Sequence, residues 1–237
     1  MKRPGQAYVA FILLLPVALL VIALVIGGGR LVYQKIRLQN AADGAAYTAA
    51  LWQSRGLNCI ADLNWALLAA EGGEAASLNW DFKISRAISD SQGAALKAFP
   101  GVAALAMYDN FAKNNAEGKC LPLIAGLSDA RMFSLRLRKK EKLLFIERDT
   151  PDYWVKQEES GPVIRVICNN PPGDFPLSGL LGRSRPELWA GAAALPALAG
   201  DSDTSVPLFG DLWIPGYYPR LTAVNIKIPF INRAVLH

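Results

Sequence analysis

The sequence has very little histidine. Its 237 residues contain one, His237 at the end of the chain. Histidine-dependent triads, metal sites and proton relays are therefore disfavoured, while carboxylate chemistry stays open. The glycines at 27–29 are not followed by the GK[ST] of a phosphate-binding loop, and no CxxC pair is present. We expect no catalytic residue, no cofactor, no metal and no small-molecule substrate.

Acidic residues are missing from the first thirty positions, where Lys2, Arg3 and Arg30 flank an apolar run. Without these three residues, 22 basic side chains nearly balance 20 acidic ones. The net charge of +5 thus reads as a membrane-topology signal and gives little support for nucleic-acid binding.

The run from Ala7 to Ile26 is free of charge and long enough to cross a bilayer as a helix. A cleaved secretory signal is the alternative, although signal cores are usually shorter. We expect a single-pass protein of the bacterial inner membrane, with its N-terminus cytoplasmic and its bulk periplasmic. The basic residues Arg30, Lys35 and Arg37 after the span oppose this orientation.

An alanine-rich helical pattern follows the span and includes the stretch LQNAADGAAYTAALW, residues 38–52. Alanine favours helix and leaves a low surface that neighbours can approach closely. We expect the helix to continue from Arg30 to Glu71, over about 60 Å, and to stop at Gly72 and Gly73. The predicted divisions are a tail (1–6), a transmembrane helix (7–29), an extended helix (30–71) and a periplasmic α+β domain (72–237).

These residues resemble a known family. The basic tail, the apolar span with FILLLP, and LVYQKIRLQNAADGAAYTAA are similar to TadE/TadG-like proteins of the tight-adherence (Flp) pilus machinery, as are RGLN and the later Asn64. The resemblance implies a bitopic, pilin-like protein with a periplasmic domain that builds or anchors a pilus. It also implies a signature helix formed by Leu38, Gln39, Asn40, Ala41, Ala42, Asp43, Ala45 and Ala46. We expect the alanines of this helix to contact other pilin-like helices.

The resemblance also raises the question of processing. Gly5 occupies the place of the glycine after which prepilin peptidases cut, but the fifth residue after it is Ala10 where cleaved pseudopilins have glutamate. A new amino terminus would then lie in lipid without a carboxylate partner. We therefore expect an uncleaved, TadG-like chain.

The rest of the chain predicts a small antiparallel sheet packed on the long helix, in an α+β fold. Residues 75–111 read as one or two helices broken near Pro100 and Gly101, and Pro186–Leu195 as a short helix. The segments Val163–Cys168 and Arg220–Ile228 alternate as strands, with residues 207–219 as a loop between them.

Three cysteines permit one disulfide, and we favour Cys120 with Cys168 because Cys59 lies in a helical stripe; other pairings, and none, stay open. The densest basic cluster includes Arg136, Arg138, Lys139 and Lys140. It is either a solvated face or a docking patch for lipid head groups or an acidic partner.

The sequence therefore predicts a non-catalytic, single-span membrane protein that assembles or anchors a tight-adherence pilus, with pilus proteins and membrane lipid as partners. The alternative is a generic signal-anchored periplasmic protein, or an envelope enzyme using carboxylates. The carboxylates in EGGE, Glu71 and Glu74, read as a helix end, and DSDTS at 201–205 reads as a turn.

Overall fold

The computed structural model describes residues 5–78, 81–115, 118–122, 138–140, 153–155, 163–173, 187–198, 203–206, 210–213 and 216–222. The elements in these ranges are α1 (Gly5–Ala76), α2 (Lys83–Asn114), β1 (Lys119–Pro122), β2 (Arg138–Lys140), β3 (Tyr153–Val155), β4 (Ile164–Asn170), β5 (Leu188–Leu198), β6 (Asp203–Val206), β7 (Gly210–Trp213) and β8 (Tyr217–Thr222). This is the α+β class that the sequence predicted.

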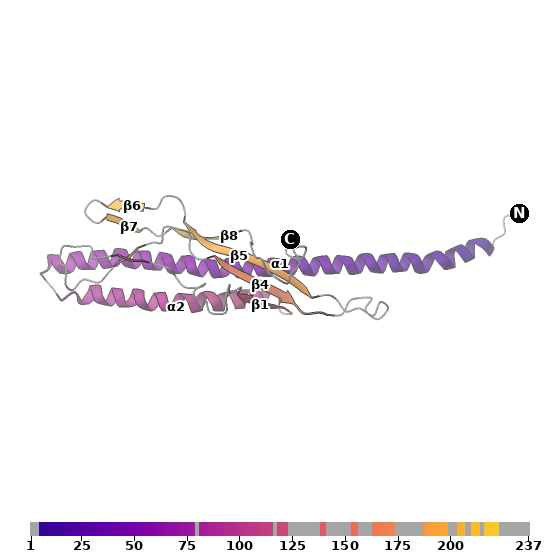
Figure 1. The fold of residues 1–237 in the computed structure, drawn as a ribbon, viewed down its shortest axis with the longest axis horizontal. Helices are drawn as coiled ribbons and strands as arrows, with labels where there is room; N and C mark the ends of the chain where they lie inside the picture. The colour runs from indigo at the N-terminus through magenta and orange to yellow at the C-terminus, as the bar shows by residue number, and fades with distance from the viewer. Residues whose placement is uncertain are drawn as a thin grey trace.

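The helix α1 dominates the molecule. It has 72 residues, which corresponds to about 108 Å at 1.5 Å per residue. Its N-terminal part projects alone, while its C-terminal part packs against α2 and the sheet (Figure 1). The projecting part contains a segment long and apolar enough to cross a membrane, and almost none of that segment is buried.

The helix α1 does not stop at Gly72 and Gly73, so that expectation was wrong. It runs on to Ala76. Each glycine costs roughly 1 kcal/mol in a helix interior, but packing against a second helix can outweigh this cost. The flanking Glu71 and Glu74 are both buried, which shows that this last turn is held by tertiary contacts.

The helix α2 is likewise continuous through Pro100 and Gly101, where the sequence predicted a break. An interior proline removes one backbone hydrogen bond and costs about 3 kcal/mol. Immediately after it, Ala103, Met107 and Phe111 recur every fourth residue and are buried. They lie in the same core as α1, and this packing holds the helix together beyond the proline.

The main sheet has the strand order β1-β4-β5-β8, and all its neighbours are antiparallel. Residues alternate between buried and half-buried along β4, which confirms the predicted strand at 163–168. The strand predicted at Arg220–Ile228 is found only at its start, because β8 ends at Thr222 and residues 223–228 lie outside the described part. The predicted loop at 207–219 was wrong in two places: it contains β7 and the first residues of β8. The predicted turn at 201–205 contains the start of β6.

The helix predicted at Pro186–Leu195 was also wrong, because β5 occupies this segment as a central strand. Its alanines at 190, 192, 193 and 194 are buried, and α1 and β5 are in contact. Small side chains on both elements let the strand approach the alanine face of the helix closely. Pairing with β4 and β8 therefore overrides the helix propensity of alanine.

A pair of prolines marks the far end of β5, where Pro196 lies opposite Pro219 of β8. Proline has no N–H to give, so this pair fits a position at which facing residues do not exchange hydrogen bonds. Pro219 is tolerated because β8 is an edge strand, and Pro196 because it lies past the stretch of β5 that pairs with β4.

Candidate functional site

The signature helix lies where α1 meets the sheet, and its alanines are covered by the chain itself. Ala41, Ala42, Ala45 and Ala46 are at most 1% exposed and share one core with α2, β4 and β5. The expectation that they contact other pilin-like helices was therefore wrong. Their small side chains allow the sheet and α2 to pack closely on α1.

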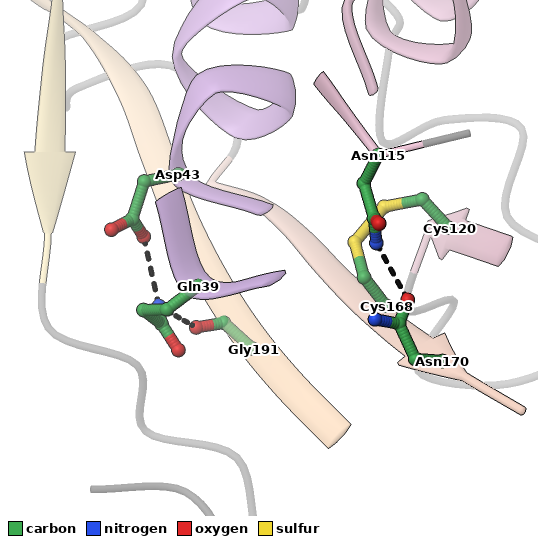
Figure 2. Close-up of a disulfide and its surroundings, with 7 residues drawn as sticks. All are labelled: Gln39, Asp43, Asn115, Cys120, Cys168, Asn170 and Gly191. Carbon is green, nitrogen blue, oxygen red and sulfur yellow. Dashed lines mark hydrogen bonds between the residues drawn. A yellow bond between two sulfur atoms is a disulfide. The ribbon is translucent and has the colours of Figure 1, made fainter. Parts of the chain in front are cut away.

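The polar residues of this helix bind the backbone of β5. Gln39 donates one hydrogen bond to the carbonyl oxygen of Gly191 at 2.9 Å and another to Asp43 at 3.0 Å (Figure 2). Lys35, one turn earlier, donates to the carbonyl oxygen of Trp189. Trp189 and Gly191 lie before Ala193, where the pairing of β5 with β8 begins. The α1 side chains therefore provide hydrogen bonds to carbonyl groups that the described part of β8 does not reach.

Burial shifts the ionisation of two of these side chains. Desolvation raises the pKa of Asp43, partly offset by the hydrogen bond from Gln39. Desolvation also lowers the pKa of Lys35. Both shifts follow from the sheet covering this face of α1.

The two asparagines that carry the resemblance further along α1 also have structural partners. The side chain of Asn58 accepts from the backbone N–H of Gly216 (3.1 Å) and Tyr217 (2.9 Å), and donates to the Tyr217 carbonyl (3.1 Å). The start of β8 is thereby fixed to the helix. Asn64 accepts a hydrogen bond from Gln92 of α2 at 2.9 Å, inside the helical hairpin.

Glu74 joins the two helices at the end far from the membrane segment. The residue before α2, Phe82, has a left-handed backbone and supplies no side-chain cap. The Glu74 carboxylate instead accepts from the backbone N–H of Ile84 (2.8 Å) and Ser85 (3.4 Å) and from the Ser85 hydroxyl. An anion at this position satisfies free N–H groups and complements the helix dipole.

The ionisation of Glu74 reflects this arrangement. Burial would raise its pKa, but the hydrogen bonds from Ser85 and Ile84, helped by the charge of Arg86, outweigh burial, and the net pKa is lowered. The EGGE carboxylates thus take part in helix packing, which gives no support to a carboxylate enzyme.

A disulfide joins β1 to β4 at the end of the sheet nearer the free part of α1. Cys120 and Cys168 are bonded and stand opposite each other in the strand register, and Cys59 is a half-buried free thiol. This is the pairing that we favoured. Two residues beyond Cys168, Asn170 accepts a 2.6 Å hydrogen bond from Asn115, and both amides are 3% exposed (Figure 2).

A pocket of about 290 Å³ opens between this corner and the first turns of α1 beyond the apolar segment. It is lined by Arg30, Tyr33, Gln34 and Arg37 of α1 and by Asn115 and Asn170. The four α1 residues follow the spacing i, i+3, i+4, i+7 and share one face of the helix. Arg37 is fixed by a 3.2 Å hydrogen bond from its Nε to the carbonyl oxygen of Asn114 at the end of α2.

The remaining predicted residues stay untested. Gly5 is the first residue of α1, and Ala10 lies in its second turn. Of the basic cluster, Arg136 lies outside the described residues. Arg138, Lys139 and Lys140 form β2, which pairs with β3. In the described ranges, no group of three or more His, Cys, Asp and Glu residues is placed to hold a metal ion.

Part of the chain is similar to a known protein family. Residues 5–53 match the family described as "Putative Flp pilus-assembly TadE/G-like". The N-terminal fifth of the chain is similar to this family. The matched region spans the free half of α1 and the signature helix, so it confirms the resemblance and supports involvement in Flp pilus assembly. Comparisons with curated proteins and with solved structures found no match.

Several residues that hold the helices and the sheet together were not predicted from the sequence. Lys35 and Gln39 bind a strand more than 150 residues away in the sequence. No local sequence pattern predicts such a distant partner. Glu74 carried a weak signal, since an acidic residue shortly before a predicted helix is a candidate for capping its N-terminus. Asn170 lies two residues beyond the predicted strand 163–168, and its amide partner Asn115 lies at the end of α2.

Proposed function

We propose that this chain is a non-catalytic, single-span, pilin-like protein that assembles or anchors a tight-adherence pilus. The observation that carries the proposal is the family match at residues 5–53, which coincides with a helix that is free and apolar in one half and packed on an antiparallel sheet in the other. Its partners are pilus-assembly proteins and membrane lipid.

The proposed location is the bacterial inner membrane, with the N-terminus in the cytoplasm and the folded domain in the periplasm. The disulfide between Cys120 and Cys168 supports this orientation, because disulfides persist in oxidising compartments. A reporter that is active only in the cytoplasm, fused after His237, should be inactive. Activity of this fusion would refute the orientation.

The chain keeps its first five residues on this proposal. Ala10 offers no carboxylate to pair with the amine that cleavage after Gly5 would create, and an unpaired charge in lipid is costly. Mass spectrometry of the purified protein should find the mass of a chain that retains residues 1–5. A mature N-terminus at Gln6 would contradict an anchoring role and favour a polymerised subunit.

The pilus role is tested by deletion and complementation in the native host. Cells that lack the protein should lose surface pili and regain them with the wild-type gene. Antibody labelling should find the protein in membranes and not along sheared filaments. Normal piliation without the protein would refute the proposal and favour a generic signal-anchored periplasmic protein.

A further inference from the structure

The pocket between α1 and the Asn115–Asn170 corner lies at a defined depth if α1 crosses a bilayer. The charge-free run Ala7–Ile26 covers about 30 Å, the thickness of a hydrocarbon core. Arg30 then lies about 6 Å beyond the last apolar residue, and Arg37 about 10 Å further along the axis. This range spans the head-group layer on the side of the folded domain.

The lining of the pocket suits a phosphate group. Two guanidinium groups, which bind phosphate through several N–H donors, come from Arg30 and Arg37. The Nε of Arg37 is held by Asn114, which orients the rest of the guanidinium group. The amide nitrogen of Asn170 is not used in its bond with Asn115, so it remains as a donor. The six lining residues include no Asp or Glu.

The surroundings favour a lipid over a soluble anion. Tyr33, 66% exposed, belongs to the lining, and tyrosine is enriched at membrane interfaces because its ring is apolar and its tip polar. Below it, Val25 and Ile26 are exposed on the free helix and offer an apolar surface for acyl chains. A phospholipid whose phosphate group occupies the pocket therefore keeps its acyl chains in the bilayer.

We propose that this pocket binds the phosphate head group of an anionic phospholipid and thereby fixes the folded domain at the membrane surface. The lipid bridges the turns of α1 just beyond the apolar segment to the ends of α2 and β4, which the hydrogen bond from Asn115 to Asn170 joins. The proposal rests on membrane insertion of α1 and is independent of any role in a pilus.

The test uses the full chain in nanodiscs that contain equal amounts of phosphatidylglycerol and phosphatidylcholine, with native mass spectrometry of the lipids that stay bound. The wild type should retain phosphatidylglycerol preferentially. Each of Arg30→Gln and Arg37→Gln should weaken this preference about fivefold, and the double variant roughly 25-fold. Arg30 is exposed, so its replacement leaves the fold intact.

The matched control is Arg55→Gln, which removes the same charge from an exposed position of α1 about 38 Å along the helix axis from Arg30. It should leave the lipid preference unchanged. Equal retention of both lipids by the wild type, or an unchanged preference in the double variant, would overturn the proposal. So would an equal loss in Arg55→Gln, which would indicate a general charge effect.

Two further arms separate the lipid from other anions. Thermal unfolding in a neutral detergent is measured with inorganic phosphate and with a poly-glutamate peptide, each against sodium chloride at the same ionic strength. We expect neither anion to raise the Tm of the wild type more than it raises the Tm of the Arg30→Gln, Arg37→Gln double variant. Arginine-dependent stabilisation by free phosphate or by the acidic peptide, without a lipid preference in nanodiscs, would refute the lipid assignment.

Discussion

Ala42 and Ala46 allow a sharp test of how α1 and the sheet are joined. Both side chains are fully buried in the core that α1 shares with α2, β4 and β5. Replacing either by leucine adds three carbon atoms to a closely packed contact. Overpacking of this kind costs about 1–3 kcal/mol per site.

For a chain of this size, 1 kcal/mol lowers Tm by about 2–4 °C, so each leucine should lower Tm by roughly 2–12 °C. The double variant should lose more, though not the sum, because the two sites are one helical turn apart and share neighbours. The assay is thermal unfolding of the purified full chain in detergent, followed by circular dichroism.

The control is Asn40→Leu, which adds a leucine at an exposed position of the same helix and should unfold like the wild type. Purified protein contains no pilus partner, so a lower Tm reports packing within the chain. If the double variant unfolds at the temperature of Asn40→Leu, the internal packing described for these alanines is refuted, and contact with other helices becomes the better interpretation.

Three other changes test the contacts at the two ends of the domain. Glu74→Gln should lower the free energy of unfolding, measured in urea at neutral pH, by about 0.5–2 kcal/mol. Folding lowers the pKa of Glu74, so the stability that its carboxylate contributes is present above the ordinary value of 4.5 and is lost as pH falls through the lowered folded value. The variant and the wild type should therefore have similar stability in acid. Replacing Cys120 and Cys168 by serine opens a loop whose ends are 48 residues apart, which should cost about 4 kcal/mol, and non-reducing peptide mapping should find these two linked with Cys59 free. Gly118→Ala would place a Cβ 2.8 Å from the Asn169 carbonyl oxygen and should lower Tm, whereas Gly93→Ala, with open space around it, should not.

The parts of the fold that local composition determines could be predicted. A charge-free run followed by alanines predicts the long helix, because span length and helix propensity act within the segment. The alternation of Ile164, Val166 and Cys168 on one face of β4 is also visible in the sequence. The disulfide was favoured because Cys59 lay within a helical stripe, which left the other two cysteines.

The parts that depend on distant contacts could not be predicted. Gly72 and Pro100 are local stop signals, but packing between α1 and α2 carries both helices past them. The alanines of β5 have the composition of a helix, and only the presence of β4 and β8 on either side makes them a strand. Local propensity is a weak prior wherever burial between layers supplies more free energy.

The buried signature helix changes where partners are to be sought. The family match ends at residue 53 and includes the signature helix, where α1 docks on β5 of its own sheet. The alanines of the signature are explained by that docking, because larger side chains would push the sheet away. On the proposed pilus role, a partner contacts other surfaces of α1: its exposed apolar segment, or exposed positions such as Asn40 and Tyr47.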